Sequence, residues 1–352
     1  MGIIEVILLI LTGSFVAQII KRWFGTPLVV NQMIVGILLG PVGLGLLRSD
    51  LFVHQISEFG VIFLMFIAGL ESNLRLLKKY LEPSLVVASL GVTLPMIGFP
   101  ILGLIMGFSW FRALFLGVTF AATSVSISVA VLNEMNRLDS REGSVILGAA
   151  VADDIISVLL LGGINSLFRL NGHGNVWLSA LFQIIFLFFS VGLIKWLPVW
   201  FRMVPNRYFL TLVMLVCLGE TSLAQRVGLS LVTGAFLAGV AVGQINRFQS
   251  RTLACFKALG NLFFVPVFFI GIGLEMTLNG ILSNLPLLII LIVLAVLTKF
   301  FGAGFGALLC KLNLKSAMLI GSGMVSRGEV ALIIVQLGYH QAIFSSGWYS
   351  VI

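Results

Sequence analysis

Long apolar stretches alternate with short polar segments along the chain, and this pattern predicts helices of membrane-spanning length. The apolar stretches are close to the roughly 20 residues that a helix needs to cross about 30 Å of hydrocarbon. They lack the alternation typical of a transmembrane β-strand, so a barrel is excluded. Dividing the chain at polar, proline and glycine positions predicts twelve helices. They cover residues 3–20, 28–47, 55–71, 84–107, 112–133, 143–168, 176–200, 207–222, 227–243, 261–277, 284–310 and 315–338.

The composition excludes a water-soluble protein. Of the 352 residues, 59% are hydrophobic and 10% are charged, whereas a soluble domain carries about 25% charged residues. The three cysteines lie far apart and show neither a disulfide framework nor metal-ligand spacing. We therefore predict an all-α polytopic membrane protein that is embedded in a lipid bilayer, uses no cofactor and is not an enzyme. The first apolar stretch has no basic segment before it, so we interpret it as a retained helix rather than a signal peptide.

The basic residues are distributed unequally between the two sides of this predicted topology. Of the 21 Lys and Arg residues, one side receives Lys21, Arg22, Arg75, Lys78, Lys79, Arg137, Arg141, Lys195, Arg202, Arg207, Arg247, Arg251, Lys257, Lys311 and Lys315. The other side receives Arg48, Arg112, Arg169 and Arg226, while Lys299 and Arg327 lie inside predicted helices. The positive-inside rule then places the N-terminus outside and the first loop in the cytoplasm. Topology thus explains the net charge of +8 without a nucleic-acid partner.

The two halves of the chain resemble each other. Residues 63–77 are similar to 267–282, and residues 36–40 are similar to 234–239. The paired helices are seven steps apart, so they run in opposite directions, as in the inverted-topology repeats of many secondary transporters. We expect a first repeat of six helices in 1–168, a linker helix in 169–206 and a second repeat in 207–352. The repeat also predicts a thirteenth helix that begins near 344–352 and is truncated here.

Two adjacent acids stand in the middle of the sixth predicted helix. An ionisable side chain at membrane depth costs about 2.5–3.5 kcal/mol, so Asp153 and Asp154 are expected to be functional or paired. Neighbouring residues on a helix point about 100° apart, so the two carboxylates are expected to have different partners. Lys299 is the one lysine deep inside a predicted helix, and it can neutralise one acid. The alternatives are that the acids only hold helices together and that Lys299 extends to an interface.

Polar residues interrupt two further helices at corresponding places in the repeat. The fifth contains Thr123, Ser124, Ser126 and Ser128, and the twelfth contains Ser326, Arg327, Gly328 and Glu329. Such interruptions suggest broken helices whose free backbone groups line a polar cavity beside the two acids. Local bonding of the hydroxyls to their own helix, and a purely structural Arg327–Glu329 ion pair, remain alternatives.

This set of groups suits a site that exchanges cations and protons. Sodium prefers oxygen ligands, which a carboxylate, hydroxyls and carbonyls provide. A buried carboxylate can also bind a proton near neutral pH, so the two ligands would compete. An intramembrane aspartyl protease is disfavoured because its two acids must flank one water, whereas these are neighbours on one helix. A channel stays open as a rival function, and so does a potassium or ammonium exchanger with the same machinery.

These residues resemble a known family. The segment TSVSISVAVLNEMNRLDSREGSVILGAAVADDI, with the later Lys299 and SRGEV, is similar to the monovalent cation/proton antiporter-2 family, in particular its NapA/GerN-type bacterial sodium/proton antiporters. The resemblance covers nearly the whole chain. Its Asp-Asp pair differs from the Gln-Asp of Kef-type potassium-efflux relatives.

The resemblance implies a fold, a site and a mechanism. It implies two crossed discontinuous helices and a homodimer in the bacterial inner membrane. A transport domain, from helices near 55–168 and 261–338, would move past a dimerisation domain, from helices near 3–47 and 207–243. Its site would use Asp154 as the ligand of Na+ or a proton, and Asp153 as the partner of Lys299. Thr123 and Ser124 would lie at the first helix break, and Arg327 and Glu329 at the second. It further implies electrogenic exchange of Na+, and also of Li+, for more than one H+.

Overall fold

The computed structural model describes residues 3–47, 50–167, 176–201, 205–245, 256–276 and 284–328, together with six residues between 331 and 344. Every regular element among these residues is helical, as the apolar pattern predicts. The helices are α1 (Ile3–Phe24), α2 (Leu28–Leu39), α3 (Leu51–Glu71), α4 (Leu74–Lys79), α5 (Leu81–Ile105), α6 (Trp110–Ala121), α7 (Val125–Glu134), α8 (Arg141–Leu167), α9 (Val176–Trp200), α10 (Asn206–Arg226), α11 (Leu231–Gly243), η1 (Gly260–Phe264), α13 (Val265–Glu275), α14 (Leu285–Leu309) and α15 (Leu314–Gly323).

The described helices have the length and composition of membrane spans. Nine apolar helical stretches within the described ranges are long enough to cross a bilayer, and α2 and α11 are shorter apolar helices. Several helices begin at a side-chain cap, because Asp50, Ser109, Ser230 and Asn313 each accept a hydrogen bond from the amide three residues later. These caps satisfy backbone donors that would otherwise be unpaired in an apolar environment.

Two helix boundaries differ clearly from the sequence prediction. The predicted helix 28–47 ends at Leu39, because the chain turns at Gly40 and Pro41 and then folds back, with the amides of Leu44 and Leu47 donating to α2 carbonyls. The predicted helix 315–338 ends at Gly323, where an interruption begins. The short helix α4 was not predicted.

Two helix crossings in the structure are set by similar close glycine contacts. A Cβ atom on Gly36 of α2 would lie 2.2 Å from the carbonyl oxygen of Ile270 and 3.0 Å from Cα of Gly273 on α13. In the same way, a Cβ atom on Gly69 of α3 would lie 2.2 Å from the Phe236 carbonyl oxygen on α11. Only glycine permits backbones to approach this closely. The glycine contacts therefore set both crossings, and the inverted repeat stays a prediction.

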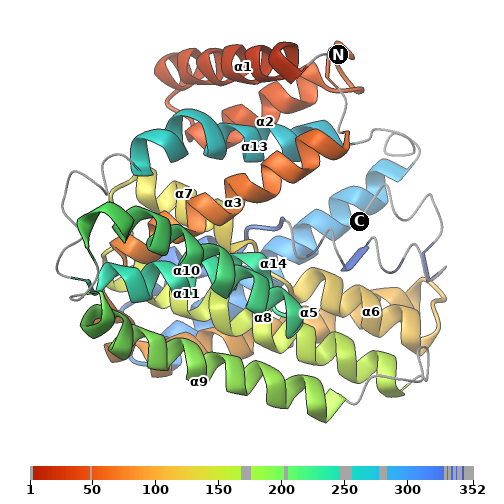
Figure 1. The fold of residues 1–352 in the computed structure, drawn as a ribbon. Coiled ribbons are helices and arrows are strands. Elements are labelled where there is room, and N and C mark those ends of the chain that lie inside the picture. The colour runs from red at the N-terminus through yellow and green to blue at the C-terminus, as the bar shows by residue number, and fades with distance from the viewer. Residues whose placement is uncertain are drawn as a thin grey trace.

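Helix packing divides the molecule into two sets. One set contains α1, α2, α3, α10, α11 and α13, and the other contains α5, α6, α8, α14 and α15, while α7 and α9 contact helices of both sets. Figure 1 shows α1 at one edge of the molecule and α9 at the opposite edge. The resemblance implied that helices near 55–71 and 261–277 belong with the transport helices. In the structure, α3 packs against α11 and α13 packs against α2, and the division into two domains stays a prediction.

Candidate functional site

Asp153 and Asp154 lie near the middle of α8 and are buried, with 1% and 3% of their surfaces exposed. Successive residues on a helix point about 100° apart, so the two carboxylates face different neighbours. Asp153 faces α14, whereas Asp154 faces the first turn of α11. The pair therefore lies where the two sets of helices meet.

Asp153 forms an ion pair with Lys299 of α14. The Lys299 Nζ atom lies 3.0 Å from Asp153 Oδ1, and the lysine side chain is fully buried. The same Nζ atom donates a 2.6 Å hydrogen bond to the carbonyl oxygen of Ala121, the last residue of α6. The free carbonyl groups at a helix C-terminus carry partial negative charge, so both contacts stabilise the ammonium group.

Close packing of α5 against α14 keeps water from Lys299. A Cβ atom on Gly302 would lie 2.6 Å from the Leu90 carbonyl oxygen, and a Cβ atom on Gly91 would lie 3.8 Å from Lys299 Nζ. The two backbones meet directly beside the lysine. Lys299 therefore does not extend to an interface, the alternative that the sequence left open.

The two helix interruptions lie against each other. The first separates α6 from α7, and the second follows α15. The Ser124 amide donates a 2.9 Å hydrogen bond to the Ser326 carbonyl oxygen, and Ser326 Oγ donates back to the Ser124 carbonyl oxygen at 2.8 Å. Ser128 Oγ donates at 2.5 Å to the carbonyl oxygen of Gly323, the last residue of α15. Each interruption thus satisfies polar groups of the other.

Thr123 and Ser124, the predicted hydroxyl ligands, lie in the first interruption. Thr123 Oγ1 donates a 3.4 Å hydrogen bond to the Met324 carbonyl oxygen, and Ser124 Oγ lies 3.1 Å from Ser126 Oγ. Ser124 also caps α7. The Thr123 contact joins the two interruptions, and the Ser124 contacts lie within the first. Participation of the two hydroxyls in cation binding stays a prediction.

Arg327 points back toward the end of α6. One guanidinium nitrogen donates to the Ala122 carbonyl oxygen, and Nε and Nη2 are buried without a hydrogen-bond partner among the described residues. Glu329, the expected partner of Arg327, lies outside the described residues.

The hydroxyl groups at Asp154 come from α11 and its cap, and they were not predicted. Ser230 Oγ and Thr233 Oγ1 donate hydrogen bonds of 2.5 and 2.6 Å to Asp154 Oδ2. Ser230 immediately precedes an apolar run, and this pattern indicates a helix cap. It does not indicate which distant carboxylate the cap will meet.

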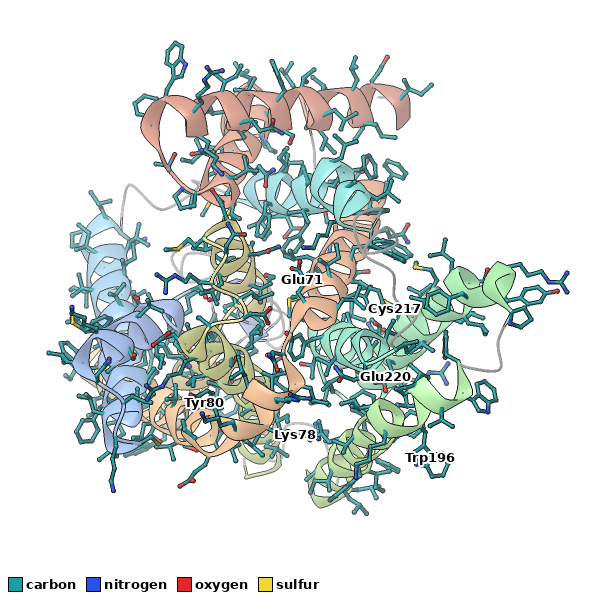
Figure 2. The ribbon with its side chains drawn as sticks, turned by 90° about the vertical axis from the view of Figure 1, so that its left-hand side faces the viewer. Glu71, Lys78, Tyr80, Trp196, Cys217 and Glu220 are labelled. Atoms are coloured by element: carbon teal, nitrogen blue, oxygen red, sulfur yellow. The ribbon has the colours of Figure 1, made fainter. Side chains whose placement is uncertain are left out.

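A third buried acid, Glu220 of α10, lies apart from Asp153 and Asp154. Ser190 Oγ of α9 donates a 3.0 Å hydrogen bond to its Oε2 atom. Figure 2 shows Glu220 on α10 near Cys217, one turn earlier in the helix. Neither residue joins a cluster of three or more His, Cys, Asp or Glu side chains, and the described part of the chain contains no such cluster.

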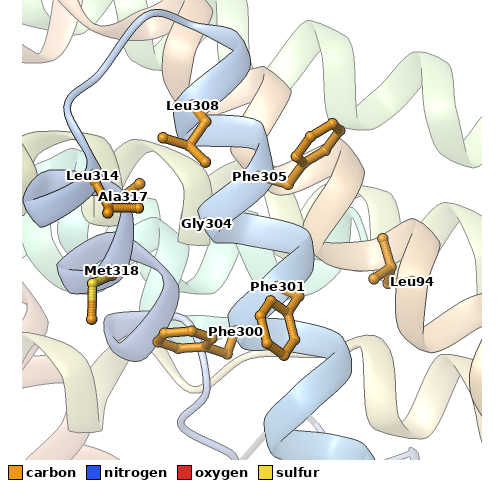
Figure 3. A pocket seen from close by; sticks show the side chains of 9 residues that line it. All are labelled: Leu94, Phe300, Phe301, Gly304, Phe305, Leu308, Leu314, Ala317 and Met318. Atoms are coloured by element: carbon orange, nitrogen blue, oxygen red, sulfur yellow. The ribbon is translucent and has the colours of Figure 1, made fainter.

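An apolar pocket between α14, α15 and α5 is unsuited to cations. It has a volume of about 490 Å³ and is lined by Leu94, Phe300, Phe301, Gly304, Phe305, Leu308, Leu314, Ala317 and Met318 (Figure 3). None of these side chains offers an oxygen ligand. The buried acids on α8 therefore remain the candidate site.

Comparison with known proteins shows the family to which the chain belongs. Residues 7–352 match the family model described as sodium/hydrogen exchanger, transmembrane. The chain is 40% identical to a Na(+)/H(+) antiporter of Enterococcus hirae, over 99% of this chain and 93% of that protein. It is 38% identical to the Na(+)/H(+)-K(+) antiporter GerN of Bacillus cereus, over 98% of this chain and 90% of that protein.

A solved structure also resembles this fold. The structure of the sodium proton antiporter MjNhaP1 from Methanocaldococcus jannaschii matches with a TM-score of 0.69, covering 98% of this chain and 90% of that one. The sequence identity is 15%, so this likeness concerns the fold alone.

Proposed function

Because the chain belongs to the sodium/hydrogen exchanger family, we propose that it is a secondary active transporter that exchanges Na+ for H+ across a membrane. The observation that carries the proposal is the pair of adjacent, buried carboxylates with different surroundings. Asp153 bonds to Lys299, while Asp154 accepts hydroxyl hydrogen bonds. A carboxylate in this second environment can bind either a proton or a hard cation.

Competition for Asp154 provides the coupling. Na+ and H+ each neutralise the carboxylate, and a bare charge is costly to move through a low-dielectric barrier. Asp154 therefore crosses the barrier only with Na+ or H+ bound. Carrying Na+ in one direction and H+ in the other produces exchange. Thr123 and Ser124 supply further oxygen atoms from the first interruption, while Arg327 holds the second interruption against the end of α6.

Relocation is of the elevator type, in which one set of helices moves past the other. The two crossings at Gly36 and Gly69 join α2 to α13 and α3 to α11. We therefore revise the domain division expected from the sequence. The dimerisation domain contains α1, α2, α3, α10, α11 and α13, and the transport domain contains α5, α6, α8, α14 and α15. The helix α7 belongs with the transport domain, because Ser128 bonds it to the end of α15.

The protein functions as a homodimer in a bacterial plasma membrane, with its N-terminus outside. The 15-to-4 distribution of basic residues supports this orientation. More than one proton enters for each Na+ that leaves, and Li+ is also transported. Each extra charge moving inward gains about 2.3 kcal/mol per 100 mV, which assists export of the cation.

Exchange of K+ or NH4+ for H+ is the alternative function. The Na(+)/H(+)-K(+) antiporter GerN, at 38% identity, supports this alternative, since its name includes K+. The K(+) efflux antiporter 5 of Arabidopsis thaliana, at 24% identity, is a more distant relative. The site chemistry is the same in both cases, so selectivity must be measured.

The test is Asp154→Asn in reconstituted liposomes that contain an interior pH dye. Asparagine keeps the shape and an acceptor for the two hydroxyls, so we expect a folded protein in which cation-driven proton flux is lost. Asp50→Asn is the matched control, because it converts an exposed carboxylate into an equally good helix cap. Sodium-dependent proton flux that survives in Asp154→Asn would contradict the assignment, and a response to K+ alone would select the alternative.

A further inference from the structure

The first turn of α11 contacts the carboxylate that binds the transported ions. We propose that Ser230 and Thr233 form a latch, named here the α11 latch, which holds the cation-free carboxylate of Asp154 and competes with Na+. The inference rests on the proposed function. It assigns a positioning role to two residues of α11, which packs with α3 and α10 and not with the set of helices that contains α8.

The geometry of the α11 latch suits an anion. Both hydroxyls donate to the same atom, Asp154 Oδ2, at 2.5 and 2.6 Å. Ser230 Oγ accepts the Thr233 amide at 3.2 Å, and this leaves its single proton for the carboxylate. Thr233 is buried and Ser230 half-buried. The α11 N-terminus also presents the positive end of the helix dipole to Asp154.

The α11 latch is anchored to helices that do not include α8. A Cβ atom on Gly239 would lie 2.2 Å from the Phe66 carbonyl oxygen of α3. Toward α10, a Cβ atom on Gly234 would lie 2.8 Å from the Glu220 carbonyl oxygen. These close backbone contacts hold α11 with α3 and α10. Any sliding of α8 past α11 must therefore break both hydrogen bonds to Asp154.

The strength of the α11 latch depends on the charge of Asp154. Hydrogen bonds to an ionised carboxylate are about twice as strong as those to a neutral group. A bound proton or Na+ neutralises the carboxylate and weakens its hydrogen bonds to Ser230 and Thr233. The loaded Asp154 can then move away from α11 with the rest of α8. The ionised Asp154 without a ligand stays bonded to α11, so movement of the empty site across the membrane is suppressed. A cation must displace the two hydroxyl protons, and this raises the concentration of Na+ needed for exchange.

Thr233→Val tests the α11 latch, since it removes one hydroxyl at nearly constant shape and leaves the Ser230 cap in place. We expect the KM for Na+, measured at a pH high enough for Asp154 to be ionised and for the KM to be independent of pH, to fall by about tenfold, the equivalent of one lost charged hydrogen bond, with the maximal rate maintained. Thr233→Ser keeps the hydroxyl and should keep the wild-type KM. Thr221→Val is the matched control, because its buried hydroxyl donates at 2.7 Å to the Cys217 carbonyl oxygen of its own helix.

An unchanged KM in Thr233→Val would overturn the proposal. A raised KM would also overturn it, because the Thr233 hydroxyl would then be a ligand of the cation. Stabilisation by Na+ of each purified protein against heating gives a second measure of binding that does not require transport. In Thr233→Val, the Na+ concentration that gives half of the maximal stabilisation should be about tenfold lower than in the wild type. An unchanged concentration would contradict the latch. Failure of the proposed function is distinguishable, since it would appear as absent exchange in the wild type or as exchange in Asp154→Asn.

Discussion

Substitution of Asp153 by asparagine should destabilise the protein by leaving Lys299 as a buried, unpaired cation. At the observed 3.0 Å separation, and with an effective dielectric constant of about 20, the attraction between the two charges is about 5–6 kcal/mol. Removing one partner of a buried pair costs about 3–5 kcal/mol in measured cases. Lys299 retains its 2.6 Å hydrogen bond to the Ala121 carbonyl oxygen, so we expect a loss at the lower end of this range.

The assay is thermal unfolding of the purified protein in detergent. Asp153→Asn should unfold at a clearly lower temperature than the wild type, whereas the exposed Asp50→Asn control should not. Adding Lys299→Met should recover part of the loss, because the double variant contains no unpaired charge from this pair. An Asp153→Asn protein as stable as the wild type would refute the reasoning, as would a double variant less stable than the single one.

Two further substitutions test the packing that positions the site. Gly69→Ala should prevent folding or lower the unfolding temperature strongly, because its Cβ atom would lie 2.2 Å from the Phe236 carbonyl oxygen, while Gly192→Ala has open space and should be neutral. Equal unfolding temperatures for the two variants would contradict the crossing. Ser128→Ala should cost about 1–3 kcal/mol in thermal unfolding, since it removes a hydroxyl that bonds to a carbonyl at the second interruption. The exposed Ser89→Ala control loses a bond within its own helix and should unfold like the wild type, so a Ser128→Ala protein with the same midpoint would count against this link.

The sequence predicts the existence of the helices better than their ends. Hydropathy identifies apolar segments, but it does not show where an apolar chain stops being helical. Residues 40–47 remain apolar after α2 ends, and they bury Leu47 by folding back over the helix. Polar residues are the better signal, because Thr123 and Ser124 do indicate the break between α6 and α7.

The sequence likewise predicts some residues of the candidate site and misses others. The unfavourable free energy of a charge at membrane depth singles out Asp153, Asp154 and Lys299 from sequence alone. Ser230 and Thr233 could not be assigned in this way, because they lie 76 and 79 residues from Asp154. Their contact depends on which faces of α8 and α11 meet, and the glycine contacts of α11 with α3 and α10 help to determine the orientation of α11.

The central claim, that Na+ and H+ compete for one buried carboxylate, is tested most directly by the pH dependence of the KM for Na+ in reconstituted liposomes. Competition predicts that, below the pH at which Asp154 loses its proton, the KM rises tenfold for each unit by which pH falls, while the maximal rate at saturating Na+ is maintained. A KM for Na+ that does not change with pH would mean that the two ions bind at separate sites, and it would contradict the proposed mechanism.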